Sequence, residues 1–225
     1  MVFSELIEAL RCVRPHDDAP LIAVADDVVE RDIRRGSLGC PACRAEYPIA
    51  AAVADFRLGR DGPAPAPDKT RVAEELAIRA GALLGLAEPG GLVVLAGTWT
   101  SCAPELAALA EPVRLLALDA APGIASGAGV SLARTAGEIP LRAGAARGIA
   151  LDAAHATAGY LETAAAALAP RGRLVAPAAA AVPPGFTELA RDARDWVAEK
   201  TVTPAVVPLA RAPRRAPAQS PSPDA

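Results

Sequence analysis

The sequence has few aromatic residues, few lysines and no long hydrophobic run. Aromatic side chains make up 3% of its 225 residues, and almost all of its basic residues are arginines. The formal net charge is −3 and the arginines are scattered, which gives nucleic-acid binding little support. No stretch approaches the ~20 apolar residues of a membrane helix, and Glu5 and Glu8 precede any apolar run, unlike a signal peptide. We therefore expect a cytoplasmic protein without a membrane or nucleic-acid partner.

The four cysteines do not suggest a disulfide framework. Three of them lie within the first 43 residues, and Cys102 stands alone. We expect Cys102 to be a buried small hydrophobic residue rather than a nucleophile. The hydrophobic content of 52% allows a sizeable core, and the length suits one medium domain with a smaller one.

The pair Cys40 and Cys43 carries the clearest local signal. A C-x2-C step on a turn with proline directs two thiolates to one point, which is half of a tetrahedral zinc site. Cys12 and His16 are the candidates for the other half. Zinc would stabilise a segment of about fifty residues that is too small to bury a large core. The alternative is a metal-free β-ribbon with reduced thiols, and both interpretations stay open.

Residues 38–49, with Cys40, Cys43 and the run Glu-Tyr-Pro-Ile, resemble the second knuckle of the zinc ribbon in the Trm-type methyltransferase activator family. Residues 4–10 resemble the opening helix of that family, and Pro15 and His16 stand where its second cysteine is expected. The resemblance implies a small activator or an N-terminal appendage of a methyltransferase. It therefore implies a protein partner that binds through the ribbon.

The distribution of proline divides the chain into four parts. Residues 59–69 are rich in proline and form an expected linker. We expect a ribbon module over 1–58, a linker over 59–69, an α/β domain over 70–211 and a disordered tail over 212–225.

Apolar runs of strand length alternate with helical patterns in the expected α/β domain, which favours a parallel sheet covered on both faces. The predicted strands are 92–95, 113–118, 148–151 and 173–176, with a closing strand at 205–209. The predicted helices begin at Thr70 and at Ser101 and span 157–169 and 186–199.

Three segments of this domain are similar to motifs of class I S-adenosylmethionine-dependent methyltransferases. They are Ala-Leu-Ala-Pro-Arg-Gly-Arg-Leu-Val at 167–175, Leu-Ala-Leu-Asp at 116–119 and Glu-Ile-Pro-Leu at 138–141. The resemblance implies an α/β fold with a Rossmann-like, class I methyltransferase-type sheet. It also implies that Asp119 binds the cofactor ribose and that Gly97 lies under the methionyl group.

The cofactor loop departs from that family. Its Gly-x-Gly-x-Gly turn is reduced to Gly97 in Ala-Gly-Thr-Trp-Thr-Ser, and Thr135 stands near the expected adenine-binding acid. One ribose-binding carboxylate contributes only ~1.5–3 kcal/mol. We therefore expect S-adenosylmethionine to bind weakly or not at all.

Each candidate site residue has a second interpretation. Asp119 either binds a ribose or caps the following turn, and Gly97 either lines a pocket or permits a turn. Trp99 either stacks on an adenine or plugs the pocket. Asp152 and His155 lie at the carboxyl edge of the sheet, where ligands bind. His155 is either a catalytic general base or an exposed residue at a helix start.

Three functions fit these patterns, and the sequence leaves open whether the chain is an enzyme. The first is a degenerate methyltransferase-like protein that acts as a binding or regulatory partner. The second is an active S-adenosylmethionine-dependent small-molecule methyltransferase. The third is a nicotinamide dehydrogenase. Asp119 follows Gly97 by about twenty residues, as a ribose-binding acid would, but the motif Gly-x-Gly-x-x-Gly is absent.

Overall fold

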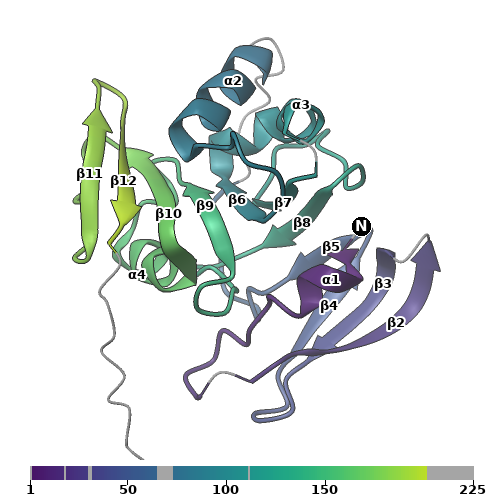
Figure 1. The fold of residues 1–225 in the computed structure, drawn as a ribbon. Helices are drawn as coiled ribbons and strands as arrows, with labels where there is room; N and C mark the ends of the chain where they lie inside the picture. The colour runs from purple at the N-terminus through teal and green to yellow at the C-terminus, as the bar shows by residue number, and fades with distance from the viewer. Residues whose placement is uncertain (1, 18, 30–31, 65–72, 111, 202–225) are drawn as a thin grey trace, which may run out of the picture.

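The computed structural model describes the chain except residues 1, 18, 30–31, 65–72, 111 and 202–225 (Figure 1). Its N-terminal part, the ribbon, consists of β1 (Val2–Phe3), α1 (Ser4–Ile7), β2 (Ile22–Val29), β3 (Asp32–Gly39), β4 (Glu46–Ala50) and β5 (Val53–Asp55). The remaining elements, the α/β part, are α2 (Ala73–Leu84), β6 (Leu92–Ala96), the 3₁₀ helix η2 (Gly97–Cys102), α3 (Ala103–Leu109), β7 (Arg114–Leu118), β8 (Val130–Arg134), β9 (Ala146–Ala150), α4 (Ala158–Ala167), β10 (Leu168–Pro177), β11 (Phe186–Arg191) and β12 (Asp195–Lys200). None of the described helices is long and apolar enough to span a membrane.

The α/β part has a Rossmann-like, methyltransferase-type mixed sheet with strand order β8-β7-β6-β9-β10-β12-β11. The strands from β8 to β10 are parallel, whereas β12 runs antiparallel to both of its neighbours. The central strands β6 and β7 are apolar and buried almost throughout, as expected of strands covered on both faces.

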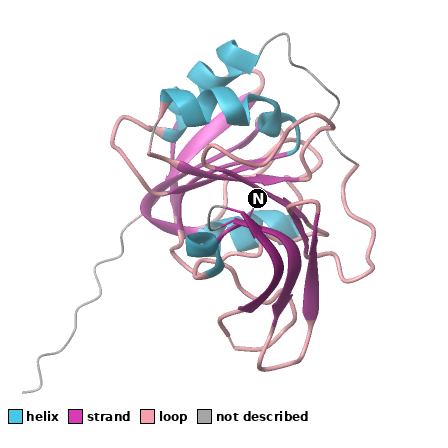
Figure 2. Ribbon diagram, turned by 90° about the vertical axis from the view of Figure 1, so that its right-hand side faces the viewer, coloured by secondary structure: helices cyan, strands magenta, loops and turns pink. Residues whose placement is uncertain are grey.

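Helices cover the two faces of this sheet unequally. α2 and α3 pack on one face with the side chains of one core cluster, and α4 packs on the opposite face (Figures 1 and 2). The second face is also covered by the ribbon, whose buried residues belong to the same core cluster as those of α4.

The ribbon continues the sheet of the α/β part. Its last strand, β5, pairs in parallel with β8, with Val53 opposite Leu132 and Asp55 opposite Arg134. The sheet therefore runs from β1 through β3, β4 and β5 into the α/β part, and β2 pairs with β3 at its outer edge.

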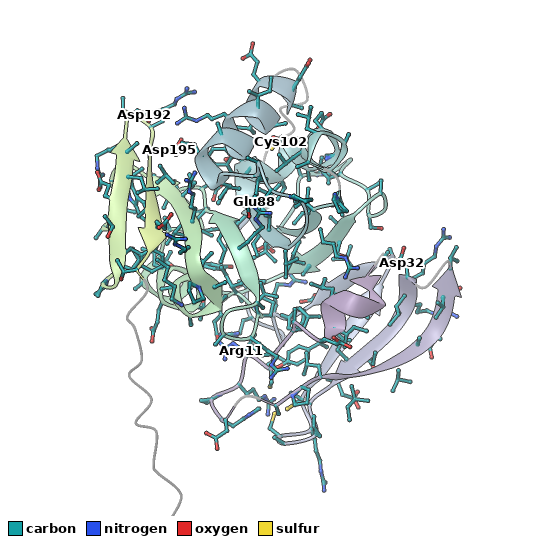
Figure 3. All side chains as sticks on the ribbon, viewed as in Figure 1. Arg11, Asp32, Glu88, Cys102, Asp192 and Asp195 are labelled. Carbon is teal, nitrogen blue, oxygen red and sulfur yellow. The ribbon has the colours of Figure 1, made fainter. Side chains whose placement is uncertain are left out.

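A second contact joins the ribbon to the segment between β8 and β9. Leu10 and Leu141 form an antiparallel bridge, and the Arg11 amide donates to the Pro140 carbonyl at 3.0 Å. The Arg11 guanidinium lies 3.7 Å from the Glu138 carboxylate, at the boundary seen in Figure 3. The two parts thus share backbone hydrogen bonds, the Arg11–Glu138 ion pair and a common core.

The prediction of a helix over 186–199 is wrong, because this segment forms the β11–β12 hairpin. Asp192 closes its turn by accepting hydrogen bonds from the amides of Arg194 and Asp195, both at 2.8 Å. Trp196 and the two residues after it are all buried, as in a central strand. Asp192 and Asp195 lie beside α2 (Figure 3), where both accept hydrogen bonds from Arg79.

The other predicted elements of the described α/β part are present within a few residues, and β8 was not predicted. Thr70, the closing strand 205–209 and the tail 212–225 lie outside the described residues, as does the linker beyond residue 64.

We expect Leu10→Ala to destabilise the whole chain, because Leu10 is 1% exposed and belongs to the shared core. Such a truncation costs about 2–5 kcal/mol. Trp99 and Trp196 both lie in the α/β part. Urea unfolding followed by tryptophan fluorescence therefore measures how far a change in the ribbon destabilises the α/β part. Leu109→Ala, at a residue 61% exposed, should change stability by less than about 0.5 kcal/mol. An unchanged tryptophan transition in Leu10→Ala would mean that the ribbon unfolds separately.

Candidate functional site

Four side chains of the ribbon converge just beyond the end of β3. The sulfurs of Cys12, Cys40 and Cys43 and a ring nitrogen of His16 all lie within 4.8 Å of one another. Cys12 Sγ is 3.6 Å from Cys43 Sγ, and Cys40 Sγ is 3.3 Å from His16 Nε2. Sulfur and nitrogen ligands at ~2.0–2.3 Å from one tetrahedral ion are roughly 3.5–3.8 Å apart. The cluster can therefore hold a metal ion.

Neighbouring groups orient two of these ligands. His16 Nδ1 donates to the Asp17 carbonyl at 2.6 Å, which orients the ring so that Nε2 faces the cluster. The buried hydroxyl of Tyr47 lies 3.0 Å from Cys12 Sγ and accepts a hydrogen bond from the Val13 amide. Tyr47, from the Glu-Tyr-Pro-Ile run, thus positions a ligand that lies 35 residues away.

The turn that carries Cys40 and Cys43 is closed by its backbone. The Cys40 amide donates to the Ala45 carbonyl, and the Arg44 amide donates to the Cys40 carbonyl. Burial raises the pKa of Cys43, but hydrogen bonds from the Ala45 amide and from the neighbouring thiols and His16 outweigh it and lower this pKa to about 7. That favours the thiolate, which is the form that binds metals.

A second polar cluster lies at the carboxyl ends of β6, β7 and β9. Asp119 follows β7, and Asp152 and His155 follow β9. The His155 side chain is fully buried between the two carboxylates, with Nδ1 2.7 Å from Asp152 Oδ1 and Nε2 3.1 Å from Asp119 Oδ2. We refer to these three residues as the Asp-His-Asp bridge.

Each carboxylate oxygen of the bridge accepts a hydrogen bond. Asp119 accepts from the amide and the hydroxyl of Thr135, at 3.0 and 2.6 Å. The Tyr160 hydroxyl donates in turn to Thr135 Oγ1 at 2.7 Å. Asp152 Oδ2 accepts from the Thr98 amide at 2.8 Å. Both carboxylates are therefore fully engaged by groups of the protein itself.

The imidazole of the bridge is charged near neutral pH. Burial alone would lower the pKa of His155, but its hydrogen bonds to Asp119 and Asp152 and their negative charges outweigh burial and raise the pKa to about 9. Burial would raise the pKa of Asp152, but hydrogen bonds from His155 and from the Thr98 amide lower it below the ordinary value. Both ring nitrogens of His155 therefore donate, one to each carboxylate.

The sequence resemblance implies that S-adenosylmethionine binds at Gly97 and Asp119. The residues around Gly97 do not fit this mode of binding. Gly97 has a φ of 59°, and a Cβ added there would lie 2.0 Å from Asp152 Oδ2. The Asp152 carboxylate thus already rests on the glycine expected under the methionyl group. His155 connects it to Asp119, the expected ribose ligand. Side chains of the protein join the two expected contact points.

Trp99 and Cys102 lie in the core beneath α2 and α3. Trp99 is 4% exposed, and its Nε1 donates to the Leu151 carbonyl at 3.3 Å. Cys102 is fully buried, which raises the pKa of its thiol to about 12, as expected of a small hydrophobic residue. The interpretation of His155 as an exposed helix-start residue is wrong, because its side chain is buried and α4 begins only at Ala158.

Thr135 and Tyr160 had no predicted role in this site, and Asp152 was not predicted to pair with His155. The Asp-x-x-His spacing is a usable signal, because residues three apart in a turn can form an ion pair. The contact between Asp119 and His155 spans 36 residues and has no local signal.

No protein-family model matches the sequence, and no curated protein sequence matches it. Several solved structures with a similar arrangement are methyltransferases. A Methanococcus maripaludis protein assigned as an S-adenosylmethionine-dependent methyltransferase matches with a TM-score of 0.46 and 10% identity, over 61% of this chain and 92% of that one. A Galdieria sulphuraria protein assigned as a sarcosine dimethylglycine methyltransferase has a TM-score of 0.37 and 19% identity, over 47% of this chain and 46% of that one. Geranyl diphosphate C-methyltransferase from Streptomyces coelicolor has a TM-score of 0.37 and 13% identity, over 52% and 57%.

We expect the free energy of unfolding to fall as the pH rises from about 6.5 to about 9.5. The pKa of His155 is raised from 6.5 to about 9 in the folded chain, so its stabilisation is complete below pH 6.5 and is lost as the pH passes through 9. The shift corresponds to roughly 3 kcal/mol. Urea denaturation at several pH values measures this loss, and His155→Gln should be less stable at pH 6.5 and lack the dependence.

NMR provides a second measurement for the same prediction. The chain has two histidines, so the ring signals of His155 can be assigned by comparison with His155→Gln. A titration midpoint near 6.5, or equal pH slopes for the wild type and the variant, would contradict the charged bridge.

Proposed function

We propose that this chain is a methyltransferase-like protein whose cofactor site is closed by its own side chains, and that it acts as a binding or regulatory partner. The observation that carries the proposal is the buried His155 between Asp119 and Asp152. His155 occupies Asp119, which the methyltransferase resemblance assigns to the cofactor ribose, and Asp152, whose carboxylate rests on Gly97.

The charge of His155 supports the same proposal. A general base must accept a proton at the working pH and must reach its substrate. The His155 side chain is 0% exposed, and its pKa is raised to about 9. It therefore suits a structural cation between two carboxylates better than a catalytic base.

In this proposal, one side of the ribbon binds the α/β part of its own chain. β5 already pairs with β8, and Leu10 with Leu141, so this side of the ribbon is engaged within the molecule. A protein partner would bind the ribbon on its outer strand β2, where Ile22, Val24 and Val28 are each more than half exposed. Zinc at the Cys12–His16–Cys40–Cys43 cluster would hold the ribbon in the shape that makes these contacts.

We expect S-adenosylmethionine to leave the melting temperature of the wild-type chain unchanged within about 1 °C at a millimolar concentration. A ligand at a hundredfold excess over its Kd stabilises the folded state by ~2.7 kcal/mol, which is several degrees for a chain of this size. A thermal-shift titration measures this, and equilibrium dialysis with labelled cofactor gives the affinity directly.

The opposite result would favour the active methyltransferase. A rise of several degrees in the wild type that is absent from Asp119→Asn would mean that Asp119 leaves the bridge to bind the ribose. Dialysis with a Kd in the micromolar range would overturn the closed site even if the variant failed to fold.

We also expect the chain, purified without chelator, to contain about one equivalent of zinc, since structural sites bind tightly. Cys40→Ser and Cys43→Ser should lose the metal and melt at a lower temperature. Cys102→Ala is the matched control, because Cys102 lies outside the cluster and its removal should leave the zinc content unchanged. Less than about a tenth of an equivalent in the wild type would mean that the ribbon folds by packing alone.

A further inference from the structure

We propose that Cys12 and Cys43 are a redox-sensitive pair, which a hydroperoxide converts into a disulfide that takes the place of the metal in the ribbon. The two sulfurs lie 3.6 Å apart, and both cysteines are free thiols. A disulfide has a sulfur–sulfur distance of ~2.05 Å, so the sulfurs must approach by roughly 1.5 Å. The disulfide needs no metal, and only the release of an ion rests on the proposed function.

The two cysteines differ in their exposure to solvent. Cys43 is partly exposed in the turn between β3 and β4, where Pro41, Ala42 and Arg44 are exposed as well. Cys12 is only 3% exposed. A small oxidant from solvent therefore meets Cys43 first. An accessible thiol with a second thiol beside it is the arrangement in which reversible oxidation occurs.

The reaction needs no reactant besides the hydroperoxide. With hydrogen peroxide, the Cys43 sulfur attacks one peroxide oxygen and the O–O bond breaks, which gives a sulfenic acid and water. The Cys12 sulfur then attacks the Cys43 sulfur, the S–S bond forms, and the hydroxide leaves with the Cys12 proton as water. Overall, two thiols are oxidised to one disulfide, and one molecule of hydrogen peroxide is reduced to two molecules of water.

Cys40 competes with Cys12 for the oxidised sulfur, because it lies three residues from Cys43. Its own sulfur is engaged with His16 Nε2 at 3.3 Å, and its amide and carbonyl are both bonded within the turn. The Cys12 sulfur instead contacts Cys43 and is held there by the Tyr47 hydroxyl at 3.0 Å. We therefore expect oxidation to join Cys12 to Cys43 and to leave Cys40 as a thiol.

The disulfide would end metal binding without opening the ribbon. Disulfide sulfurs carry no negative charge, so Cys40 and His16 would remain as two of the four ligands of a tetrahedral site. The new bond joins residues 31 positions apart, one after α1 and one after β3, which the ion would otherwise hold together. Oxidation thus exchanges one cross-link of the ribbon for another.

The test maps the disulfides of the full chain, purified without chelator, after treatment with a small molar excess of hydrogen peroxide. Free thiols are alkylated, and mass spectrometry of the digest should show Cys12 linked to Cys43, with Cys40 and Cys102 alkylated. A chromogenic zinc chelator should detect about one equivalent of released zinc per disulfide. Dithiothreitol should restore the thiols and the uptake of added zinc.

Two variants separate disulfide formation from loss of a ligand. Cys12→Ser and Cys40→Ser each remove one thiolate from the cluster, so both should lose the metal. Only Cys40→Ser retains the pair, and it should form the disulfide as the wild type does. In Cys12→Ser, Cys43 should persist as a sulfenic acid that dimedone traps. Cys102→Ala should match the wild type in both measurements.

A wild-type map dominated by a link between Cys40 and Cys43 overturns the proposal, as does oxidation of Cys12 and Cys43 without a bond between them. Zinc that stays bound while the disulfide forms overturns the exchange of cross-links. A wild-type chain that contains no zinc would contradict the metal site of the proposed function, and the disulfide map would still decide the redox pair.

Discussion

The parallel pairing of β5 with β8 is the interaction on which the rest of the structure depends. Without it, the ribbon and the α/β part would each expose an unpaired strand edge, which invites association with other chains. The pairing also merges the small core of the ribbon with the core beneath α4, so that a ribbon with few aromatic residues is supported by a larger domain. It orders the end of β8, which brings Thr135 to Asp119.

In the proposed function, the Asp-His-Asp bridge explains why a sheet of this type would not bind its usual cofactor. Removing one member of a buried ion cluster leaves a charge without compensation and costs about 3–5 kcal/mol. A cofactor that had to displace His155 from Asp119 would lose a similar amount of binding free energy. Since each 1.4 kcal/mol is a factor of ten in affinity, the bridge would weaken such a ligand by roughly a hundredfold to a few thousandfold. The proposed closure would therefore be an energetic barrier as well as a steric one.

Local and periodic features of the structure could be predicted from the sequence, and tertiary ones could not. The strands β6 and β7 were predicted because a strand buried on both faces is apolar throughout. β8 is as long as β6 and β7, and it was missed because it contains Ser131 and follows a glycine-rich stretch. Phe186, Leu189 and Trp196 fall at helical spacing by coincidence, which led to the wrong prediction of a helix. The turn closed by Asp192 makes this segment a hairpin instead. The metal ligands could be proposed from local spacing, whereas the contacts of Asp119 with Thr135 and His155 join residues 16 and 36 positions apart.

The two polar clusters differ in what they still require. In the bridge, one imidazolium lies between two carboxylates, every carboxylate oxygen has a donor, and the residual charge is shared with backbone amides and hydroxyls. The ribbon cluster has three sulfurs and one imidazole nitrogen within 4.8 Å of one another. Burial raises the pKa of Cys12, so without an ion its thiol stays neutral beside the more acidic Cys43. A divalent cation would neutralise such a ligand set, and a second cation or cofactor would gain nothing at the bridge. In the proposed function, the chain would therefore bind a metal in its ribbon and no cofactor at the Asp-His-Asp bridge.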